Sequence, residues 1–189
     1  MNVFDSSFLI IGEGVTCKHC VEFFQKKNIT FNSLSTSNIS KINDNVIEHN
    51  NEIIDLNKID YVIVSPGVPP SNFLLKEITN YNCKLTTDIE IVQSLIGSST
   101  KYICVTGTNG KTSTVSLLSD VLNDNGINSI SCGNNGISVF KALEKEYDFV
   151  IFELSSYQLE YIKYLESYIS IILNLSQDHF ERHKTYDEY

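Results

Sequence analysis

The sequence is poor in positive charge and has no long apolar stretch. Arg182 is its only arginine, and 14 basic residues against 23 acidic ones give a formal net charge of −9. This balance argues against a broad nucleic-acid surface, and it means that an anionic substrate must be captured by local groups. No apolar run reaches the roughly 18 residues that span a bilayer, and no signal-like segment opens the chain. We therefore expect a cytoplasmic protein, a monomer, with no membrane span and no nucleic-acid partner.

The five cysteines do not form the pattern of a secreted disulfide framework, and their number is odd. Cys17 and Cys20 have the Cys-x-x-Cys spacing of redox and zinc sites. No second pair follows, however, and a helical pattern runs through the segment. We interpret both as buried or half-buried thiols on a helix.

Residues 7–97 alternate between strand and helix patterns, which predicts a parallel sheet covered on both faces. Residues 38–57 interrupt the alternation with a polar, asparagine-rich stretch that contains only short apolar pieces. The segment 97–100, Gly-Ser-Ser-Thr, is the best linker candidate. The expected strands are 7–11, 29–34, 60–65 and 84–86, and the expected helices are 15–27, 74–79 and 88–95.

A second unit is expected from residue 101 onward. Its four strands are few for a doubly wound nucleotide-binding domain, so we interpret the chain as truncated. The predicted fold class is α/β: a Rossmann-like N-terminal parallel-sheet domain over residues 1–97, then an incomplete P-loop-type ATP-binding domain over 101–189. The expected strands are 102–105, 128–132, 149–154 and 170–175. One helix is expected to end at residue 125, a second to cover 159–165 and a third to lie at the chain end.

The most informative motif is Val-Thr-Gly-Thr-Asn-Gly-Lys-Thr-Ser at residues 105–113. It joins an apolar strand pattern to a helical one, so the backbone N–H groups of the turn and the helix start can face a polyphosphate. Lys111 supplies a compact positive charge for the outer phosphates, and the Thr112 hydroxyl can hold magnesium. The glycine spacing is two residues shorter than in the common P-loop, and the alternative is a plain turn with a surface lysine. We predict a site for a nucleoside triphosphate with magnesium.

Further polar residues stand at predicted strand ends, where ligands of open parallel sheets collect. Glu153 lies at the end of the strand pattern that begins at Asp148 and Phe149, and we favour a magnesium ligand over an N-cap or an exposed acid. His179 lies in the cluster Asp-His-Phe-Glu-Arg-His at 178–183. A charged helix start explains the acids of that cluster, whereas two histidines and the lone arginine favour a functional role.

The turn Gly12-Glu13-Gly14 follows the first strand but fails the dinucleotide fingerprint. Cys17 occupies the third glycine position, and no acid ends the second strand, so NAD is not expected. The remaining alternatives are a simple tight turn and a diphosphate bound over Val15 and Thr16 at the helix N-terminus.

Three motifs in order resemble the ATP-dependent Mur ligases of peptidoglycan synthesis. They are Thr106-Gly-Thr-Asn-Gly-Lys-Thr112, Glu153-Leu-Ser-Ser-Tyr-Gln158 and Leu173-Asn-Leu-Ser-Gln-Asp-His179. The resemblance is strongest to the branch of the family that adds D-glutamate. Three further segments strengthen it: Ser65-Pro66-Gly67-Val68, Asp88-Ile89-Glu90 and Gly133-Asn134-Asn135-Gly136.

The resemblance implies an enzyme that uses ATP and Mg²⁺ to join D-glutamate to UDP-N-acetylmuramoyl-L-alanine through an acyl phosphate, in the building of the cell wall. The implied catalytic residues are Lys111, Glu153 and His179. Thr112 and Glu153 would hold one magnesium ion and His179 a second. The implied ATP-binding residues are Gly107, Thr108, Asn109, Gly110, Lys111, Thr112 and Ser113. The substrate would be held at its muramoyl-alanine end by Asn134, Ser155 and Gln158, and at its UDP end by Val15, Thr16, Ser65 and Gly67.

The resemblance also implies parts that residues 1–189 do not contain. Family members carry a carbamylated lysine shortly after the histidine motif and a C-terminal domain, so we expect this chain to be inactive alone. One alternative is a module that holds a UDP-sugar or a nucleotide without turnover. The other is a different amide ligase, such as another Mur ligase or a folylpolyglutamate synthase. The Gly12 turn and the Ser65-Pro66-Gly67 loop disfavour the folate enzyme.

Overall fold

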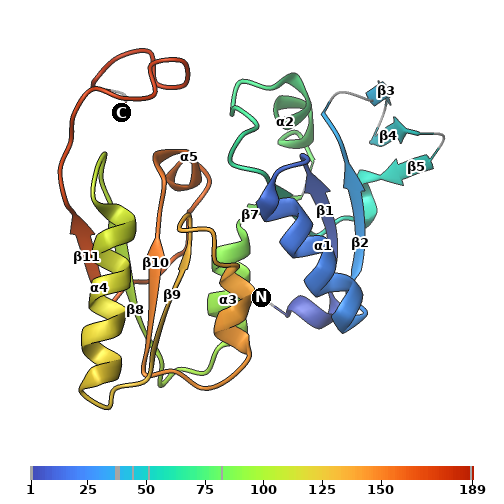
Figure 1. The fold of residues 1–189 in the computed structure, drawn as a ribbon. Coiled ribbons are helices and arrows are strands. Elements are labelled where there is room, and N and C mark those ends of the chain that lie inside the picture. The colour runs from blue at the N-terminus through green and yellow to red at the C-terminus, as the bar shows by residue number, and fades with distance from the viewer. Residues whose placement is uncertain (1, 37–38, 44, 51, 82, 188) are drawn as a thin grey trace. The chain divides into compact units, whose positions relative to one another are not determined.

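A computed structural model of the protein consists of two compact units (Figure 1). The structure describes residues 2–36, 39–43, 45–50, 52–81, 83–187 and 189. The first unit comprises Met1–Ser94 with Tyr161–Lys163, and the second comprises Leu95–Glu160 with Tyr164–Tyr189. Each unit contains its own parallel sheet, so the predicted α/β class is confirmed. No helix in the described part of the chain is long and apolar enough to span a bilayer.

The first unit is built on a four-stranded parallel sheet in the order β2-β1-β6-β7. The central strand β1 pairs Ile11 with Leu34 of β2 and with Val64 of β6, so three strands end at one level. The strands are β1 (Ser7–Ile11), β2 (Thr30–Leu34), β6 (Tyr61–Val64) and β7 (Lys84–Thr86). The helices are α1 (Val15–Lys27), α2 (Phe73–Ile78) and α3 (Asp88–Leu95), with short 3₁₀ turns at Val3–Asp5 and Leu56–Lys58.

Helix α1 buries one face against the sheet. Its buried residues Cys17, Cys20 and Phe24 are spaced three and four apart, which places them on one helical stripe. The Phe24 ring lies 4.8 Å from that of Phe8 on β1, measured between ring centroids. Burial raises the pKa of the Cys17 thiol to about 11. The interpretation of the two cysteines as buried thiols on a helix is confirmed.

A small antiparallel sheet in the asparagine-rich stretch was not predicted. It consists of β3 (Ile39–Asn43), β4 (Val46–His49) and β5 (Glu52–Asp55), in that order. Asn45 and Asn50 have positive φ angles of 82° and 51°, so asparagines at the ends of β4 serve as turn residues. Buried Ile47 joins the core of the first unit. The strands are too short for alternation to be visible locally, and Asn38, where the stretch begins, lies outside the described residues.

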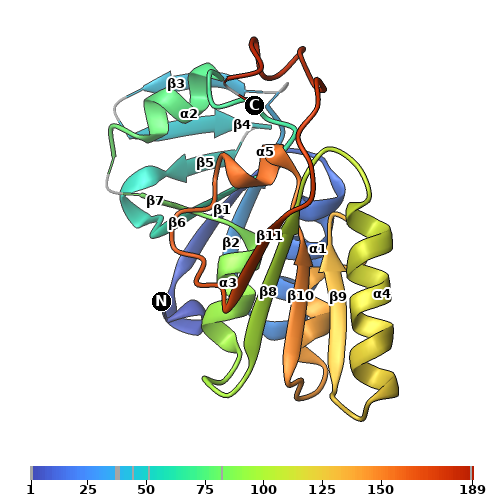
Figure 2. The same cartoon turned by 90° about the vertical axis from the view of Figure 1, so that its left-hand side faces the viewer.

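The second unit has a parallel sheet in the order β11-β8-β10-β9. Figure 2 shows these strands side by side with α4 alongside, and α4 packs against β8, β9 and β10. Val115 of α4 meets Val105 of β8 and Ile151 of β10 in the core. The elements are β8 (Lys101–Thr106), α4 (Lys111–Asp124), β9 (Ser129–Gly133), a 3₁₀ turn (Val139–Leu143), β10 (Phe149–Glu153), α5 (Ser156–Leu159) and β11 (Ile169–Ile172).

Two predicted helices of the second half are wrong. Over 159–165 the chain leaves the single turn α5 and crosses to the first unit, where the Tyr161 hydroxyl donates to the Val68 carbonyl. The Lys163 N–H donates to Glu90 Oε1 at 2.8 Å. These tertiary bonds replace the helical ones. Near the chain end, the described residues from 178 onward form turns instead of a helix.

Asp88 is a buried acid at the start of α3. Its Oδ1 accepts the Ile89 N–H at 3.0 Å, yet desolvation dominates and raises the pKa of the carboxyl to about 6. Glu90 on the same helix acts in the same direction, and the nearby Cys17 and Cys20 thiols have raised pKa values of their own. Because the folded-state pKa lies above the unfolded value of about 3.9, the contribution of Asp88 to stability is fully present below about pH 4. It is lost as the pH rises through about 6.

An Asp88→Asn variant should therefore show a flatter stability profile than the wild type. Asparagine keeps an oxygen for the Ile89 N–H and has no charge to desolvate. Between pH 4 and pH 7 the free energy of unfolding of the wild type should fall relative to the variant by on the order of 2–3 kcal/mol. Urea unfolding at stepped pH measures this difference. A difference that stays constant over the range contradicts the prediction.

Candidate functional site

The carboxyl ends of three neighbouring strands meet at one edge of the second sheet. Glu153 of β10 is in register with Val105 of β8, and Ile172 of β11 with Thr106. Backbone hydrogen bonds continue beyond the strands, since the Leu154 N–H donates to Val105 and the Leu173 N–H donates to Thr106. The structure therefore brings the Lys111 loop, Glu153 and the segment leading to His179 to the same edge.

The glycine turn after β8 leads directly into α4. Gly107 and Gly110 have φ angles of +139° and +84°, a region that glycine adopts without strain. Lys111 is the first residue of α4, and its Nζ donates to the carbonyls of Gly107 and Thr108. The N–H groups of residues 110–113 lie at the helix start, where no intrahelical acceptor exists. This cluster of free N–H groups beside an ammonium group suits an anion.

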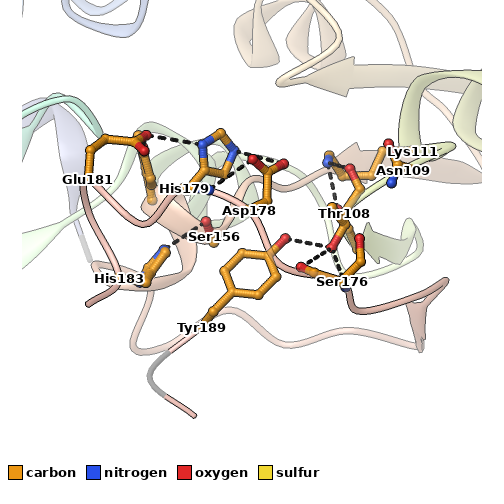
Figure 3. A network of polar contacts seen from close by, with 12 residues as sticks. Thr108, Asn109, Lys111, Ser156, Ser176, Asp178, His179, Glu181, His183 and Tyr189 are labelled. Atoms are coloured by element: carbon orange, nitrogen blue, oxygen red, sulfur yellow. Dashed lines mark hydrogen bonds and ion pairs between the residues drawn. The ribbon is translucent and has the colours of Figure 1, made fainter. Parts of the chain in front are cut away.

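The amides of Thr108 and Asn109 are used inside the protein. They donate to the backbone carbonyl and to Oδ1 of Asn174, at 3.0 and 2.9 Å. Figure 3 shows that the Thr108 hydroxyl also meets Ser176 and the Tyr189 hydroxyl, and Tyr189 lies 2.9 Å from it. In this structure the two residues shape the loop, and the N–H groups left for phosphate are those of residues 110–113. The predicted contacts of Thr108 and Asn109 with ATP stay a prediction.

Glu153 is a buried carboxylate with one oxygen unsatisfied. Glu153 is 1% exposed, and Oε1 of its side chain accepts a hydrogen bond from Nδ2 of Asn134 at 2.9 Å. Its Oε2 has no hydrogen-bond partner among the described residues. A desolvated carboxylate oxygen is costly unless a donor or a cation meets it, so the side chain fits a metal ion. The described residues hold no group of three or more His, Cys, Asp or Glu side chains for a metal. Mg²⁺ remains compatible, because it binds through one or two carboxylates plus phosphates and water.

Gly133 allows the turn after β9 to close on the backbone of Glu153. The Asn134 N–H donates to the Glu153 carbonyl at 2.9 Å. Gly133 has a φ of +110°, and a Cβ at this position would lie 2.5 Å from the Glu153 carbonyl oxygen. Backbone cannot move aside as a flexible side chain does, so only glycine fits.

Replacing Gly133 by alanine should therefore destabilise the protein by about 1–3 kcal/mol or more. Gly126→Ala is the matched control, because Gly126 also has a positive φ, +76°, but nothing lies within 4 Å of its added Cβ. The excess loss in Gly133→Ala, measured by urea unfolding, reports the collision with Glu153 together with the less favourable φ of Gly133. Equal losses in the two variants would contradict this account of the turn.

The basic residues after β11 have different surroundings. Arg182 pairs with Glu160 and lies over the Tyr157 ring, and His183 is buried with Nε2 2.9 Å from the Ser156 hydroxyl. His179 is exposed, with φ of +54° and Nδ1 3.3 Å from Glu181 Oε1 (Figure 3). Structural partners thus account for Arg182 and His183. Of the three basic residues of the cluster, His179 is the exposed one.

Comparison with known proteins shows the family of this chain. Residues 105–189 match the model of the Mur ligase middle domain. A UDP-N-acetylmuramoylalanine–D-glutamate ligase of Fusobacterium nucleatum is 42% identical over 139 residues, which cover 71% of this chain and 32% of the relative. The protein of that name from Francisella philomiragia is 33% identical over 185 residues, 97% of this chain and 42% of the relative. The chain belongs to the Mur ligase family.

The fold of this Mur ligase chain also resembles a solved structure. The crystal structure of UDP-N-acetylmuramate:L-alanyl-gamma-D-glutamyl-meso-diaminopimelate ligase from Neisseria meningitides matches with a TM-score of 0.52 at 15% identity. The match covers 94% of this chain and 63% of the other. The chain spans less than half the length of the curated relatives named above.

Ser155 and Gln158, predicted from the Mur ligase resemblance to position substrate, form a capping box at the start of α5. Ser155 Oγ accepts the Gln158 N–H at 3.3 Å, and Gln158 Oε1 accepts the Ser155 N–H at 2.9 Å. The spacing Ser-x-x-Gln is itself a signal for this motif and would have predicted it. Their role toward substrate stays a prediction, and the Gln158 Nε2 group takes no part in the box.

The candidate residues for the UDP end lie in the first unit, at the carboxyl ends of β1 and β6. Val15 and Thr16 begin α1, so their N–H groups have no intrahelical acceptor. Ser65 is buried, and Gly67 lies in the turn closed by the Val68 N–H and the Ser65 carbonyl at 2.9 Å. A Cβ on Gly12 or Gly14 would lie 2.6 Å from Ser65 atoms, so the two loops are in close contact.

Proposed function

We propose that residues 1–189 are part of an ATP-dependent ligase that adds D-glutamate to UDP-N-acetylmuramoyl-L-alanine in peptidoglycan biosynthesis, in the cytoplasm. Relatives bearing that name, at 33–42% identity, support the choice of reaction. The observation that carries the proposal is the unsatisfied, buried Oε2 of Glu153 at the strand end beside the Lys111 loop. A strand-end acid beside a lysine-bearing phosphate loop is how nucleotide-binding folds hold magnesium and triphosphate together.

The second unit would hold ATP and magnesium. The N–H groups of residues 110–113 would donate to phosphate oxygens, and Lys111 would exchange its loop carbonyls for the outer phosphates. Thr112 and Glu153 would hold one Mg²⁺, and His179 would hold a second. When bound, the metal supplies positive charge against the repulsion of the reacting anions.

The chemistry needs an activated carboxylate, because a free carboxylate is a poor electrophile. The carboxylate of the alanyl group would attack the γ-phosphorus of ATP, which gives an acyl phosphate and releases ADP. The amine of D-glutamate would then attack the acyl carbon, expel inorganic phosphate and lose a proton as the amide forms. Lys111 would stabilise the charge that develops during phosphoryl transfer, and positioning of the reactants would supply much of the remaining acceleration.

We assign the substrate to both units. In the first, which corresponds to the domain proposed over residues 1–97, Val15 and Thr16 at the start of α1 would receive the diphosphate of the UDP end, with Ser65 and Gly67 beside it. In the second, which corresponds to the domain proposed over residues 101–189, the muramoyl-alanine end would meet Asn134, Ser155 and Gln158. We propose that turnover also needs sequence outside residues 1–189, since the curated relatives are more than twice as long as the aligned part.

Phosphate release tests the proposal. It is measured with ATP, Mg²⁺, UDP-N-acetylmuramoyl-L-alanine and D-glutamate, for residues 1–189 and for the longest reading frame that contains them. We expect release that needs all the substrates in the longer protein, and Mg·ATP binding without turnover in residues 1–189. L-lysine or L-alanine in place of D-glutamate should not support release. Nucleotide binding without turnover in either protein would instead indicate a binding module, and no binding in either would refute the assignment.

A further inference from the structure

Asn174, the second residue after β11, holds the phosphate loop by a pair of side-chain hydrogen bonds. Its Oδ1 accepts the N–H of Asn109 at 2.9 Å, and its Nδ2 donates to the carbonyl of the same residue at 2.9 Å. Its backbone carbonyl accepts the Thr108 N–H at 3.0 Å. Asn109 is thus held by both of its backbone groups, much as a strand residue is held by its neighbour in a sheet.

The close approach of Asn174 also explains the glycine that opens the loop. A Cβ on Gly107 would lie 3.0 Å from the Asn174 carbonyl oxygen and 3.1 Å from its backbone nitrogen. The loop therefore lies directly on the chain that follows β11. Residues 65 positions apart in sequence make this contact, so the sequence motif around Lys111 does not reveal it.

The contacts determine which loop groups face an anion. The carbonyls of Gly107 and Thr108 accept from Lys111, and the carbonyl of Asn109 accepts from Asn174. Each of these three oxygens, which would repel phosphate, is directed at a donor. The N–H groups of residues 110–113 remain at the start of α4. If the Asn174 side chain were removed, the Asn109–Gly110 peptide would be free to rotate and present the Asn109 oxygen to the phosphates.

We propose that Asn174 is a positioning residue for the triphosphate: it holds the two peptide groups that flank Asn109 in the orientation that keeps the Asn109 carbonyl away from phosphate. The inference rests on the proposed nucleotide-binding function of the loop. It assigns Asn174 no contact with ATP. Because Asn174 is exposed, its replacement should leave the fold intact and affect the loop.

The test uses residues 1–189 with the variants Asn174→Ala and Asn174→Asp. Asn125→Ala is the matched control, since Asn125 is exposed and its side chain donates to Val121 at the far end of α4. Calorimetric titration with Mg·ATP should show binding about tenfold weaker in Asn174→Ala, the effect of losing two hydrogen bonds. Asn174→Asp should bind more weakly still, because its carboxylate faces the Asn109 carbonyl and repels phosphate. Asn125→Ala should bind like the wild type.

A second measurement separates positioning from general destabilisation. Amide hydrogen exchange should be faster at Asn109 in Asn174→Ala, while the thermal midpoint and the exchange of the β8 amides stay as in the wild type. Unchanged Mg·ATP binding in both Asn174 variants, or unchanged exchange at Asn109, overturns the inference. If the wild type itself binds no Mg·ATP, the proposed function has failed. Exchange at Asn109 then decides whether Asn174 holds the loop at all.

Discussion

Replacing Lys111 by alanine should reduce the ATP-dependent turnover of the full protein by about 10²–10³-fold or more. The reaction brings a triphosphate and a carboxylate together, and Lys111 is the first residue of α4, at the end where the helix dipole is positive. Its ammonium group already lies inside the loop, bonded to the Gly107 and Thr108 carbonyls. Alanine removes the charge but keeps the helix start. Phosphate release under saturating substrates measures the loss.

The matched control for that experiment is Lys141→Ala. Lys141 is exposed, and it pairs with Glu144 at 2.7 Å on the 3₁₀ turn of the same unit. Its removal makes the net charge more negative by the same amount but leaves the loop untouched. Turnover in Lys141→Ala should match the wild type, and Lys111→Ala should retain the wild-type thermal midpoint. A Lys111→Ala protein that turns over normally would remove the main support for the phosphate-loop role.

The second large effect is expected from Glu153→Gln. Glutamine matches the shape of glutamate and can still accept from Asn134 through Oε1, but it brings no charge to the position of the unsatisfied Oε2. We expect turnover to fall by about 10²-fold or more, because the ligand for the metal is lost. The free energy of unfolding without ligand should stay the same or rise, since a buried charge has been removed.

Thermal unfolding with and without Mg·ATP distinguishes a metal ligand from a purely structural acid. A ligand present at 100 times its Kd stabilises a protein by about 2.7 kcal/mol. The wild type should be stabilised more by Mg·ATP than by ATP alone. In Glu153→Gln this additional stabilisation by Mg²⁺ should be absent. Glu144→Gln, at an exposed glutamate of the same unit, serves as the control. A full magnesium response in Glu153→Gln would exclude Glu153 as a ligand.

Much of the framework could be predicted because its signals are local. The strands over 7–11 and 149–153 are apolar runs, and α1 shows its buried stripe in the spacing of Cys17, Cys20 and Phe24. The turn before Lys111 is marked by its glycines. Such features depend on neighbours within a few residues, so a pattern in the chain is sufficient to indicate them.

Predictions failed where distant groups replaced local ones. The helix expected over 159–165 gives way to hydrogen bonds that Tyr161 and Lys163 make within the first unit. The turns after residue 178 contain Arg182 and His183, whose partners Glu160 and Ser156 lie 22 and 27 positions away. In β3 to β5 the strands were too short for alternation to be visible. Local propensity loses in these places because long-range hydrogen bonds and burial contribute more.

The amino-acid order alone was enough to indicate the α/β class, the glycine turn before Lys111 and the position of Glu153 at a strand end, since these follow from apolar periodicity and the placement of glycine. Folding settled which polar groups meet: Asn134 with Glu153, Asn174 with Asn109 and Arg182 with Glu160. Each pair joins residues 19 to 65 positions apart. Hydrogen bonds require donor and acceptor within about 3 Å, and such proximity arises from strand order and register rather than from sequence spacing.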